Sequence, residues 1–289
     1  MSGDAESDRA SKFPLRLDSL TKPAQRASST HKAAQPIAPA TPQSTLRPQR
    51  PVHEAVQERA RRATPAGLGL DSEGVRQRMV ERLRAQGLAG VQVLAAMAAV
   101  PRHLFVDTAL ANQAYEDTSL PIGLSQTISK PSVVARMIDL MLAGRTAPLG
   151  RVLEVGTGCG YQAAVLARLA RQVISVERLR PLHDKAREHL AQLPPLGLRN
   201  DGLRLVYGDG MLGHAPNAPY DGIIAAAGGG ALPAAWLDQL GPGGRLVAPM
   251  HDAASGGHVL VVVDRDLAGN LQRSFHEAVH FVPLKSGVN

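Results

Sequence analysis

Three glycines stand at alternate positions in one short segment of this 289-residue chain, Gly156, Gly158 and Gly160 in VLEVGTGCGYQ. They directly follow the apolar run Val152–Val155 and precede a helical pattern. A turn between a buried strand and a helix lets backbone N–H groups approach a ligand closely. A dinucleotide fingerprint, G-x-G-x-x-G, would need its last glycine where Tyr161 stands. The loop therefore has the character of a cofactor loop, but its spacing is not that of a dinucleotide-binding protein.

Two carboxylates are expected at the same edge of the fold. Glu177 ends the next apolar run, 21 residues after Gly156, where an acidic side chain can accept hydrogen bonds from two ribose hydroxyls. Gly208 and Asp209 close the third run. Because open α/β sheets bind ligands at the carboxyl ends of their strands, these elements converge on one nucleoside-sized crevice. The alternative is that the glycines only make a tight turn and the carboxylates only cap helices or face solvent.

Apolar runs supply the strands that would position these residues. Helical patterns separate several of them, including Ala163–Leu169 and Leu182–Leu193. Near-continuous β-branched runs that alternate with helices are typical of a parallel sheet covered on both faces. We predict a doubly wound α/β domain with a mostly parallel, seven-stranded, Rossmann-like sheet. The runs are Val152–Val155, Val173–Val176, Leu203–Val206, Gly222–Ala226 and Arg245–Ala248, followed by two strands that a hairpin-like turn joins at Asn270.

A helical cap and a loop are predicted before this sheet. Apolar residues recur at three- and four-residue steps over Val75–Met97, with a break at Gly87–Gly90, which favours two short amphipathic helices. Residues Leu120–Pro131 are rich in turn formers and are expected to form a loop that displays polar side chains. Pro131 suits the first position of the next helix.

The basic charge of the chain lies mostly in its N-terminal segment. Residues 1–70 hold 11 Lys and Arg against 6 Asp and Glu, together with 8 of the 21 prolines and Phe13 as the single aromatic residue. Such a segment cannot bury enough surface to fold, so we expect a disordered tail. A basic tail can touch RNA or anionic surfaces, but without aromatic residues or a dense basic run a neutral extension is favoured. The folded domain is expected over residues 71–289, with the N-terminal helices and the loop in 71–145 and the sheet with its C-terminal strands in 146–289.

Composition also bears on location. The chain has no apolar run of 18 residues, and MSGDAESDRASK lacks the apolar stretch of a secretory signal, so we expect a cytoplasmic protein without membrane contact. The single cysteine, Cys159, cannot form an internal disulfide. With no His or second Cys paired to it by motif, Cys159 is interpreted as a small filler rather than a nucleophile.

Several segments, in order, resemble class I methyltransferases that use S-adenosylmethionine: VLEVGTGCGY, SVE, YGDG and LGPGGRLVAPM. The segment Leu120–Pro131 further matches the LPIGxGQTISxP signature of protein-L-isoaspartate O-methyltransferases, and AVPRHLFV and FVPL match as well. The resemblance covers residues 75–285. There are two departures: Ser125 replaces the second loop glycine, and Gly228 follows Ala226 and Ala227 where the family has proline.

The resemblance implies a cofactor, S-adenosyl-L-methionine, and a set of site residues. Lys285 and the nearby C-terminal strand would help to close the site. Isoaspartyl peptides and proteins would be the substrates, with no specific nucleic acid partner, and the protein would be a monomer that needs no metal. The implied residues are Ser129 in the active site, Gly156, Thr157, Gly158 and Gly160 beside the methionine moiety, Glu177 at the ribose, Gly208 and Asp209 on the adenine side, and Ile122, Gly123, Gln126 and Thr127 at the substrate.

The implied reaction is methylation of the free α-carboxylate of L-isoaspartyl residues, whose ester collapses to a succinimide and so begins protein repair. A carboxylate with a pKa near ~4 is already ionised at neutral pH, so no strong general base is needed. The main task is to align oxygen, methyl and sulfur. Ser129 with Thr127 would hold the carboxylate in line. The alternative for Ser129 is a local hydrogen bond at the start of the helix.

Three other functions remain to be weighed. His276, Glu277 and His280 spell the H-E-x-x-H motif of zinc proteases, which needs a helix, but the sequence around them favours a strand. On a strand the two histidines would lie roughly 13 Å apart, too far to share one zinc ion. A methyltransferase acting on RNA or a small molecule would use the same fold, but AAAGGGALP lacks the N/D-P-P-Y type motif of the nucleic-acid enzymes. A binding module with a structural cofactor would show no turnover.

Overall fold

The computed structural model describes residues 73–87, 90–145, 148–198, 200–253 and 256–289. The predicted disordered tail, residues 1–70, lies outside the described residues, so that boundary stays a prediction. No helix in the described ranges is long and apolar enough to cross a membrane.

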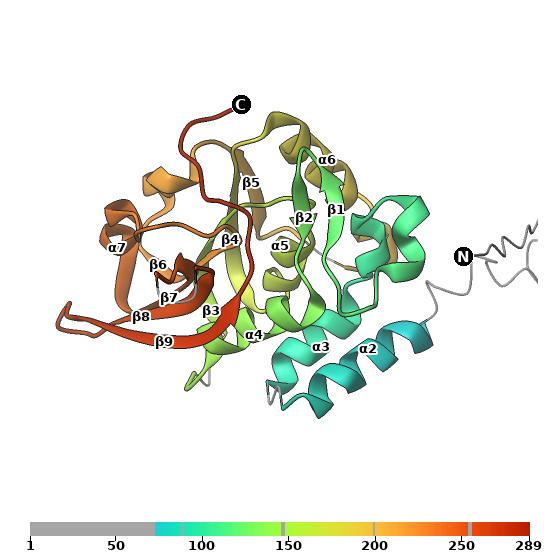
Figure 1. Ribbon diagram of the computed structural model, residues 1–289, viewed down its shortest axis with the longest axis horizontal. Helices are drawn as coiled ribbons and strands as arrows, with labels where there is room; N and C mark the ends of the chain where they lie inside the picture. Colours follow the sequence, from blue (N-terminus) through green and yellow to red (C-terminus); the bar gives the residue numbers. More distant parts are fainter. Residues whose placement is uncertain (1–72, 88–89, 146–147, 199, 254–255) are drawn as a thin grey trace, which may run out of the picture. The chain divides into compact units, whose positions relative to one another are not determined.

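A seven-stranded sheet forms the centre of the fold, in the order β5-β4-β3-β6-β7-β8-β9 (Figure 1). The first five strands pair in parallel, and β8 and β9 add an antiparallel end. This confirms the predicted mostly parallel sheet and the terminal hairpin. The strands are β3 (Leu149–Val155), β4 (Ala170–Glu177), β5 (Leu203–Tyr207), β6 (Tyr220–Ala225), β7 (Leu240–His251), β8 (His258–Arg265) and β9 (Leu271–Val279).

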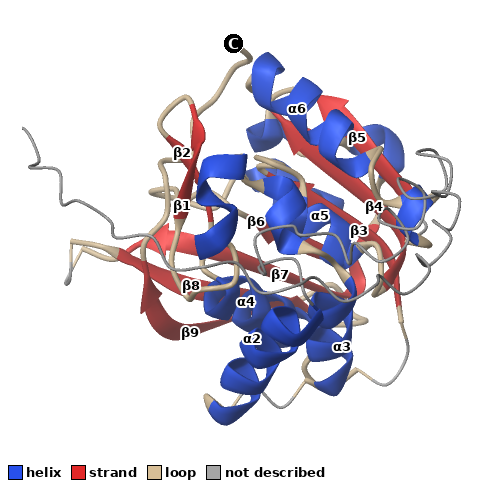
Figure 2. Ribbon diagram, turned by 90° about the vertical axis from the view of Figure 1, so that its right-hand side faces the viewer, coloured by secondary structure: helices blue, strands red, loops and turns tan. Residues whose placement is uncertain are grey.

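Alternating residues of the strands face two separate apolar clusters. Val152 belongs to one cluster and its neighbour Leu153 to the other, and both side chains are fully buried. Because successive side chains on a strand point to opposite faces, the two clusters lie on the two faces of the sheet. Residues of α5 (Tyr161–Leu166) and α6 (Arg180–Leu190) pack in the first cluster, and Trp236 of α7 (Ala234–Gln239) packs in the second. Both faces are therefore covered, as a doubly wound fold requires: α7 lies on one side of the sheet and α5 on the other (Figure 1), and Figure 2 shows the helices of the α5 side in front of the strands.

The expected N-terminal helices are present on the first of these faces. They are α2 (Glu73–Ala85), α3 (Val91–Ala99) and α4 (Pro131–Leu142), and Pro131 occupies the first turn of α4 as predicted. Between α3 and α4 the chain makes two short 3-10 helices, η2 (Arg102–Phe105) and η3 (Thr108–Gln113). The first predicted interval, Val75–Met97, thus contains two helices with the break where the glycines stand.

The predicted loop before α4 is wrong in one respect, because it contains a β-hairpin. Strands β1 (Leu120–Gly123) and β2 (Gln126–Ile128) pair antiparallel through a two-residue turn. Both turn residues have left-handed backbone conformations, with φ of 52° at Leu124 and 57° at Ser125. Such turns usually carry Asn-Gly or Asp-Gly. Neither turn residue has that chemistry here, which is why the sequence pattern indicated a loop.

The predicted helix boundaries are displaced at two places. The expected helix Leu182–Leu193 begins two residues earlier, at Arg180, because Pro181 fits the first turn, and it ends at Leu190. The expected helix Ala163–Leu169 begins at Tyr161, directly after the glycine loop, and ends at Leu166 because strand β4 begins at Ala170. The start at Tyr161 brings the helix up against the glycine loop.

Candidate active site

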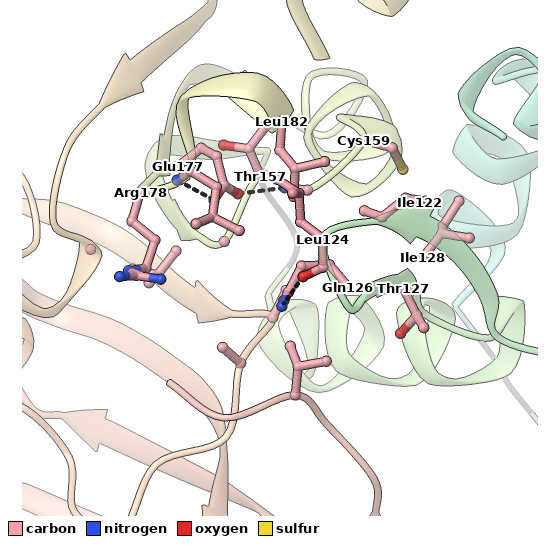
Figure 3. Close-up of a pocket in the computed structure, with 18 of the residues that line it drawn as sticks. Ile122, Leu124, Gln126, Thr127, Ile128, Thr157, Cys159, Glu177, Arg178 and Leu182 are labelled. Carbon is pink, nitrogen blue, oxygen red and sulfur yellow. Dashed lines mark hydrogen bonds between the residues drawn. The ribbon is translucent and has the colours of Figure 1, made fainter. Parts of the chain in front are cut away.

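A cavity of about 650 Å³ opens at the carboxyl ends of β3 and β4, between the glycine loop and the β1–β2 hairpin (Figure 3). This volume falls in the usual range for cofactor and substrate sites. Most of its lining comes from four parts of the chain that are far apart in sequence, with Val134, Gly210, Ala226 and Ala227 completing it. The four parts are the hairpin and its continuation to Ser129, the glycine loop with Tyr161 and Gln162, the segment from Val176 to Leu182, and the C-terminal segment with Val282–Lys285 and Asn289.

The glycine loop needs glycine for its backbone conformation. Gly156, Gly158 and Gly160 have φ values of 89°, 55° and 93°, a region that other residues adopt only with strain. Gly158 has a second requirement, because a Cβ there would lie 3.2 Å from Cδ1 of Ile122 in the hairpin. The alternating glycines thus let the chain turn from β3 into α5 and let the hairpin pack directly on the turn.

Glu177 is 5% exposed and lines the cavity at the end of β4. Its Oε2 accepts a hydrogen bond from the N–H of Gly158 at 2.8 Å, and its Oε1 accepts one from the N–H of Leu179 at 2.9 Å (Figure 3). An ionised carboxylate has about four lone-pair positions, so two remain for a ligand. The backbone therefore orients the carboxylate, which can still accept two hydrogen bonds from a diol.

Behind the glycine loop lies a buried polar chain. Ser175 donates to Oε2 of Glu154, and Thr157 Oγ1 lies 2.6 Å from Ser175 Oγ. Burial raises the pKa of Glu154 to about 8, and the hydrogen bond from Ser175 opposes this rise. The Thr157 hydroxyl is thus engaged inside the protein, so Thr157 offers the cavity its backbone rather than its hydroxyl.

On the opposite wall, Ser129 lines the cavity and is half-buried. Within the described part of the chain its hydroxyl makes no hydrogen bond, and helix α4 begins without a side-chain cap at Lys130. The start of α4 is held instead by Asp117, which accepts from the N–H and the hydroxyl of Ser132. The local hydrogen bond weighed as the alternative role of Ser129 is therefore not formed here.

The C-terminal segment closes the side of the cavity near β5. Asn289 pairs through its backbone with Arg178 and Arg180, at 2.8 Å in both hydrogen bonds. The carboxylate of Asp209 accepts from Ser286 Oγ at 2.8 Å and from the N–H of Gly287 at 2.6 Å. Burial alone would raise the pKa of Asp209, but hydrogen bonds from Gly287, Ser286 and Met211 bring it below its usual range.

A family model confirms the resemblance that these walls suggest. Residues 74–289, which include every residue that lines the cavity, match the model described as protein-L-isoaspartate(D-aspartate) O-methyltransferase. The chain belongs to this family. Members of this family use S-adenosyl-L-methionine, and Glu177 lines the cavity with carboxylate oxygens of the kind that accept hydrogen bonds from ribose hydroxyls.

Similar proteins agree with the membership in the protein-L-isoaspartate O-methyltransferase family. Relatives with that name are 69% identical in Methylibium petroleiphilum, over 97% of both chains, and 60% identical in Leptothrix cholodnii, over 99% of this chain and 98% of the other. A solved structure with the same name has a TM-score of 0.63 at 26% identity and covers 73% of this chain and 66% of its own. A Plasmodium falciparum structure described as this methyltransferase with S-adenosyl-L-homocysteine has a TM-score of 0.64 at 23% identity, over 73% of this chain and 98% of that chain.

Most of the methyltransferase residues expected from the sequence line the cavity, and four do not. Gly160 lies just outside, at the left-handed start of α5, and Gly123 belongs to the hairpin but not to the lining. Gly208 and Asp209 are also absent from the lining, since the C-terminal segment contacts Asp209 there. The expected residues that do line it are Ile122, Gln126, Thr127, Ser129, Gly156, Thr157, Gly158 and Glu177, together with Lys285.

The sequence interpretation missed several lining residues. Tyr161 was used only to reject a dinucleotide motif, yet it stands at the base of the cavity beside Gln162. Leu179 and Leu182 follow Glu177 and add apolar surface, a role that their apolar character directly after a ligand-binding strand end could have indicated. Asn289 was missed because its approach depends on long-range backbone pairing.

The two departures from the family pattern have local explanations. Ser125 occupies a left-handed turn position, at φ 57°, where the family's glycine would be free of strain. At Gly228 a Cβ would overlap the ring of His258, so the proline usual in the family would require this ring to move and would also lose the N–H that Gly228 donates to Val282. Gly228 instead pairs with Val282 and Leu284 of the C-terminal segment.

The H-E-x-x-H sequence lies where a strand was predicted. His276 and Glu277 are in β9, and His280 follows its last residue. Glu277 accepts a hydrogen bond from Nε of Arg136 at 2.6 Å, and His276 lies 3.1 Å from the Ser274 hydroxyl. The residues therefore have the geometry of a strand rather than that of a zinc-binding helix.

Proposed function

We propose that this chain transfers the methyl group of S-adenosyl-L-methionine to the free α-carboxylate of L-isoaspartyl residues in damaged proteins, which begins their repair through a succinimide. The observation that carries the proposal is the uncommitted hydroxyl of Ser129 in the cavity wall that faces the glycine loop and Glu177. One wall has the chemistry to hold a nucleoside, and the other has the chemistry to hold an anion. Family membership supports the same reaction.

The glycine loop and Glu177 form one side of the cavity, which we call the cofactor wall. It acts by binding and orienting the cofactor. Gly156 and Gly158 allow the backbone to approach the methionine part of the cofactor, and Glu177 accepts from the ribose hydroxyls. Gly208 and Asp209 do not line the cavity themselves, so their assignment to the adenine side rests on the neighbouring Gly210, which does, and Gly160 starts the helix that supports the loop. When bound, the cofactor supplies an electrophilic methyl group on a positively charged sulfur.

The β1–β2 hairpin and Ser129 form the opposite side of the cavity, which we call the acceptor wall. Its residues only have to bind and orient the substrate carboxylate, because this nucleophile needs no activation. A substrate carboxylate with a pKa near ~4 is ionised at neutral pH. Ser129 donates a hydrogen bond that holds one carboxylate oxygen while the other faces the methyl group, and Thr127 adds a second polar contact. Ile122, Gly123 and Gln126 shape the entrance to this position. Orientation of this kind contributes up to about 7 to 11 kcal/mol in well-arranged reactions.

Extended peptides and damaged proteins that contain isoaspartate are the proposed partners, with no role for nucleic acid or membranes. A monomer is sufficient for this proposal because every wall of the cavity comes from one chain. Analytical sedimentation tests whether the protein is a monomer, and cell fractionation tests the proposed cytoplasmic location.

The direct test is methyl transfer from labelled S-adenosylmethionine to an isoaspartyl peptide and to its normal aspartyl twin. The proposal expects label on the isoaspartyl peptide alone. Transfer RNA is included as a second acceptor, since label there would indicate a nucleic-acid methyltransferase. Binding of S-adenosylhomocysteine without turnover on any acceptor would indicate a binding module instead.

Replacing Ser129 tests its role within that reaction. We expect Ser129→Ala to lower kcat about 100-fold, comparable to the loss of one hydrogen-bond donor at a reacting oxygen. Ser132→Ala is a matched control, because Ser132 is only three residues away but its hydroxyl bonds to Asp117 outside the cavity. Full activity of Ser129→Ala on the isoaspartyl peptide would remove Ser129 from the mechanism.

A further inference from the structure

Arg102 is a buried cation that the proposed reaction does not use. It lies in η2, is 0% exposed and is among the largest fully buried side chains. It forms no ion pair with any residue in the described ranges. Burial lowers the pKa of Arg102, while Tyr161 acts in the opposite direction. Because a guanidinium stays charged even when buried, its charge must be satisfied by other means.

The satisfying groups belong to both walls of the active-site cavity. Arg102 Nη2 donates to the backbone carbonyl of Ser129 at 2.7 Å, and Nε donates to the carbonyl of Ala114 at 2.8 Å. The guanidinium carbon lies 4.7 Å from the centre of the Tyr161 ring, a cation–π contact. Ser129 lines the acceptor wall, and Tyr161 directly follows the last glycine of the cofactor loop. One rigid group therefore contacts both walls.

Tyr161 is fixed as a neutral ring in this contact. Its side chain is 1% exposed, and burial raises the pKa of Tyr161 to about 12, with Arg102 opposing the rise. Phe105, from the same short helix as Arg102, packs edge-on against the Tyr161 ring with 5.6 Å between the ring centres. The ring is thus clamped from one short helix, so the position of Arg102 is transmitted to the first turn of α5.

We propose that Arg102 is a positioning residue for methyl transfer, which sets the spacing between the acceptor serine and the cofactor loop. The inference rests on the proposed function of the cavity. In-line transfer requires oxygen, methyl and sulfur to be aligned, and a displacement of about 1 Å costs on the order of 100-fold in rate. Lysine would keep the charge but cannot reproduce the planar fork that reaches two carbonyls and covers a ring.

A residue that only stabilises the fold would behave differently from a positioning residue. Arg265 supplies the comparison, since its Nη1 donates to two backbone carbonyls, Leu237 at 3.2 Å and Leu240 at 2.9 Å, without lining the cavity. Each of the two arginines also has one buried nitrogen with no hydrogen-bond partner among the described residues, Nη1 in Arg102 and Nε in Arg265. Arg265→Lys is therefore the control, because it also removes a guanidinium that binds backbone carbonyls but does so outside the cavity.

The experiment measures kcat, KM for an isoaspartyl peptide and Kd for S-adenosylhomocysteine in both variants, well below the Tm of each. For Arg102→Lys we expect kcat to fall about 100-fold while Kd for S-adenosylhomocysteine changes less than about threefold, because Glu177 and Gly158 hold the cofactor wall independently. For Arg265→Lys we expect kcat within about twofold of the unchanged protein, whatever its loss of Tm.

Two results would overturn the proposal. The first is a kcat of Arg102→Lys that stays within about threefold of the wild-type value. The second is a fall of kcat in Arg265→Lys as large as the fall in Arg102→Lys. If Arg102→Lys does not fold, Tyr161→Leu removes the other side of the contact, and it must lower kcat at least about tenfold at saturating cofactor for the proposal to stand. If the wild-type protein does not methylate the isoaspartyl peptide, the proposed function itself fails. This outcome is distinct from a failure of the role proposed for Arg102.

Discussion

The glycine loop and the β1–β2 hairpin face each other across one cavity, but the protein holds them in different ways. Val155, Thr157 and Cys159 of the loop region are buried, and the loop directly continues β3, a central strand that pairs in parallel with β4 and β6. In the hairpin Leu124 is 54% exposed and Ser125 is exposed as well. The cofactor wall is therefore part of the core, whereas the acceptor wall depends on a few anchors.

Those anchors connect the hairpin to distant parts of the chain. Ile122 packs on Gly158, and Arg102 holds the carbonyl of Ser129. A wall built in this way can change its spacing without unfolding the core. Substitutions in the two walls should consequently separate cofactor affinity from turnover.

Replacing Glu177 should weaken binding of the cofactor much more than it slows methyl transfer. We expect Glu177→Ala to raise Kd for S-adenosylhomocysteine about 100-fold, since hydrogen bonds to a charged acceptor contribute about 1.5 to 3 kcal/mol. Calorimetric titration gives Kd, and kcat at saturating cofactor should fall less than about tenfold. Asp184→Ala, an exposed acid in α6, is the control and should leave Kd unchanged. A Glu177→Ala variant with normal Kd and low kcat would remove the distinction between the walls.

Glu154 should make the cofactor wall sensitive to pH. Because burial raises its pKa to about 8, the folded protein holds a proton that the unfolded chain releases above about 4.5. Its stabilising contribution is thus complete below about pH 4.5 and is lost as the pH rises through about 8. Between pH 6 and pH 9 the free energy of unfolding should fall by about 2 to 3 kcal/mol on this account.

Glu154→Gln carries no titrating proton and should remove that part of the pH dependence. Denaturant unfolding at pH 6 and pH 9 measures the difference for both proteins. Equal changes in the free energy of unfolding for the variant and the unchanged protein would show that Glu154 is ionised throughout, contrary to the buried environment described here.

The acceptor wall should become more stable when its strained turn is relieved. Ser125→Gly removes a side chain from a left-handed position, at a cost in unfolded-chain entropy, and should stabilise the protein by about 0.5 to 1 kcal/mol. Thermal unfolding measures the change. Ser119→Gly, just before β1 and not at a positive φ, should instead be neutral or destabilising. A destabilised Ser125→Gly protein would show that the serine side chain is needed in this turn.

The same contrast explains how far the sequence could predict the site. The glycine loop and Glu177 are local features, since glycine spacing and an acid at a strand end carry their meaning within about 20 residues. The hairpin was identified as the acceptor segment through its motif, but its strands were not predicted because Leu124 and Ser125 are unusual turn residues. The contacts of Arg102 with Ser129 and of Asp209 with Gly287 join residues 27 and 78 positions apart, and no local pattern encodes them.

We expect the protein to methylate isoaspartyl residues and so to repair them. The most direct measurement follows an isoaspartyl peptide by liquid chromatography and mass spectrometry during incubation with the protein and excess S-adenosylmethionine. The account predicts a methyl ester 14 Da heavier, its conversion to the succinimide, and growth of the normal aspartyl peptide as the isoaspartyl form is consumed. A peptide that keeps its mass and its isoaspartyl linkage through repeated additions of cofactor would contradict the account.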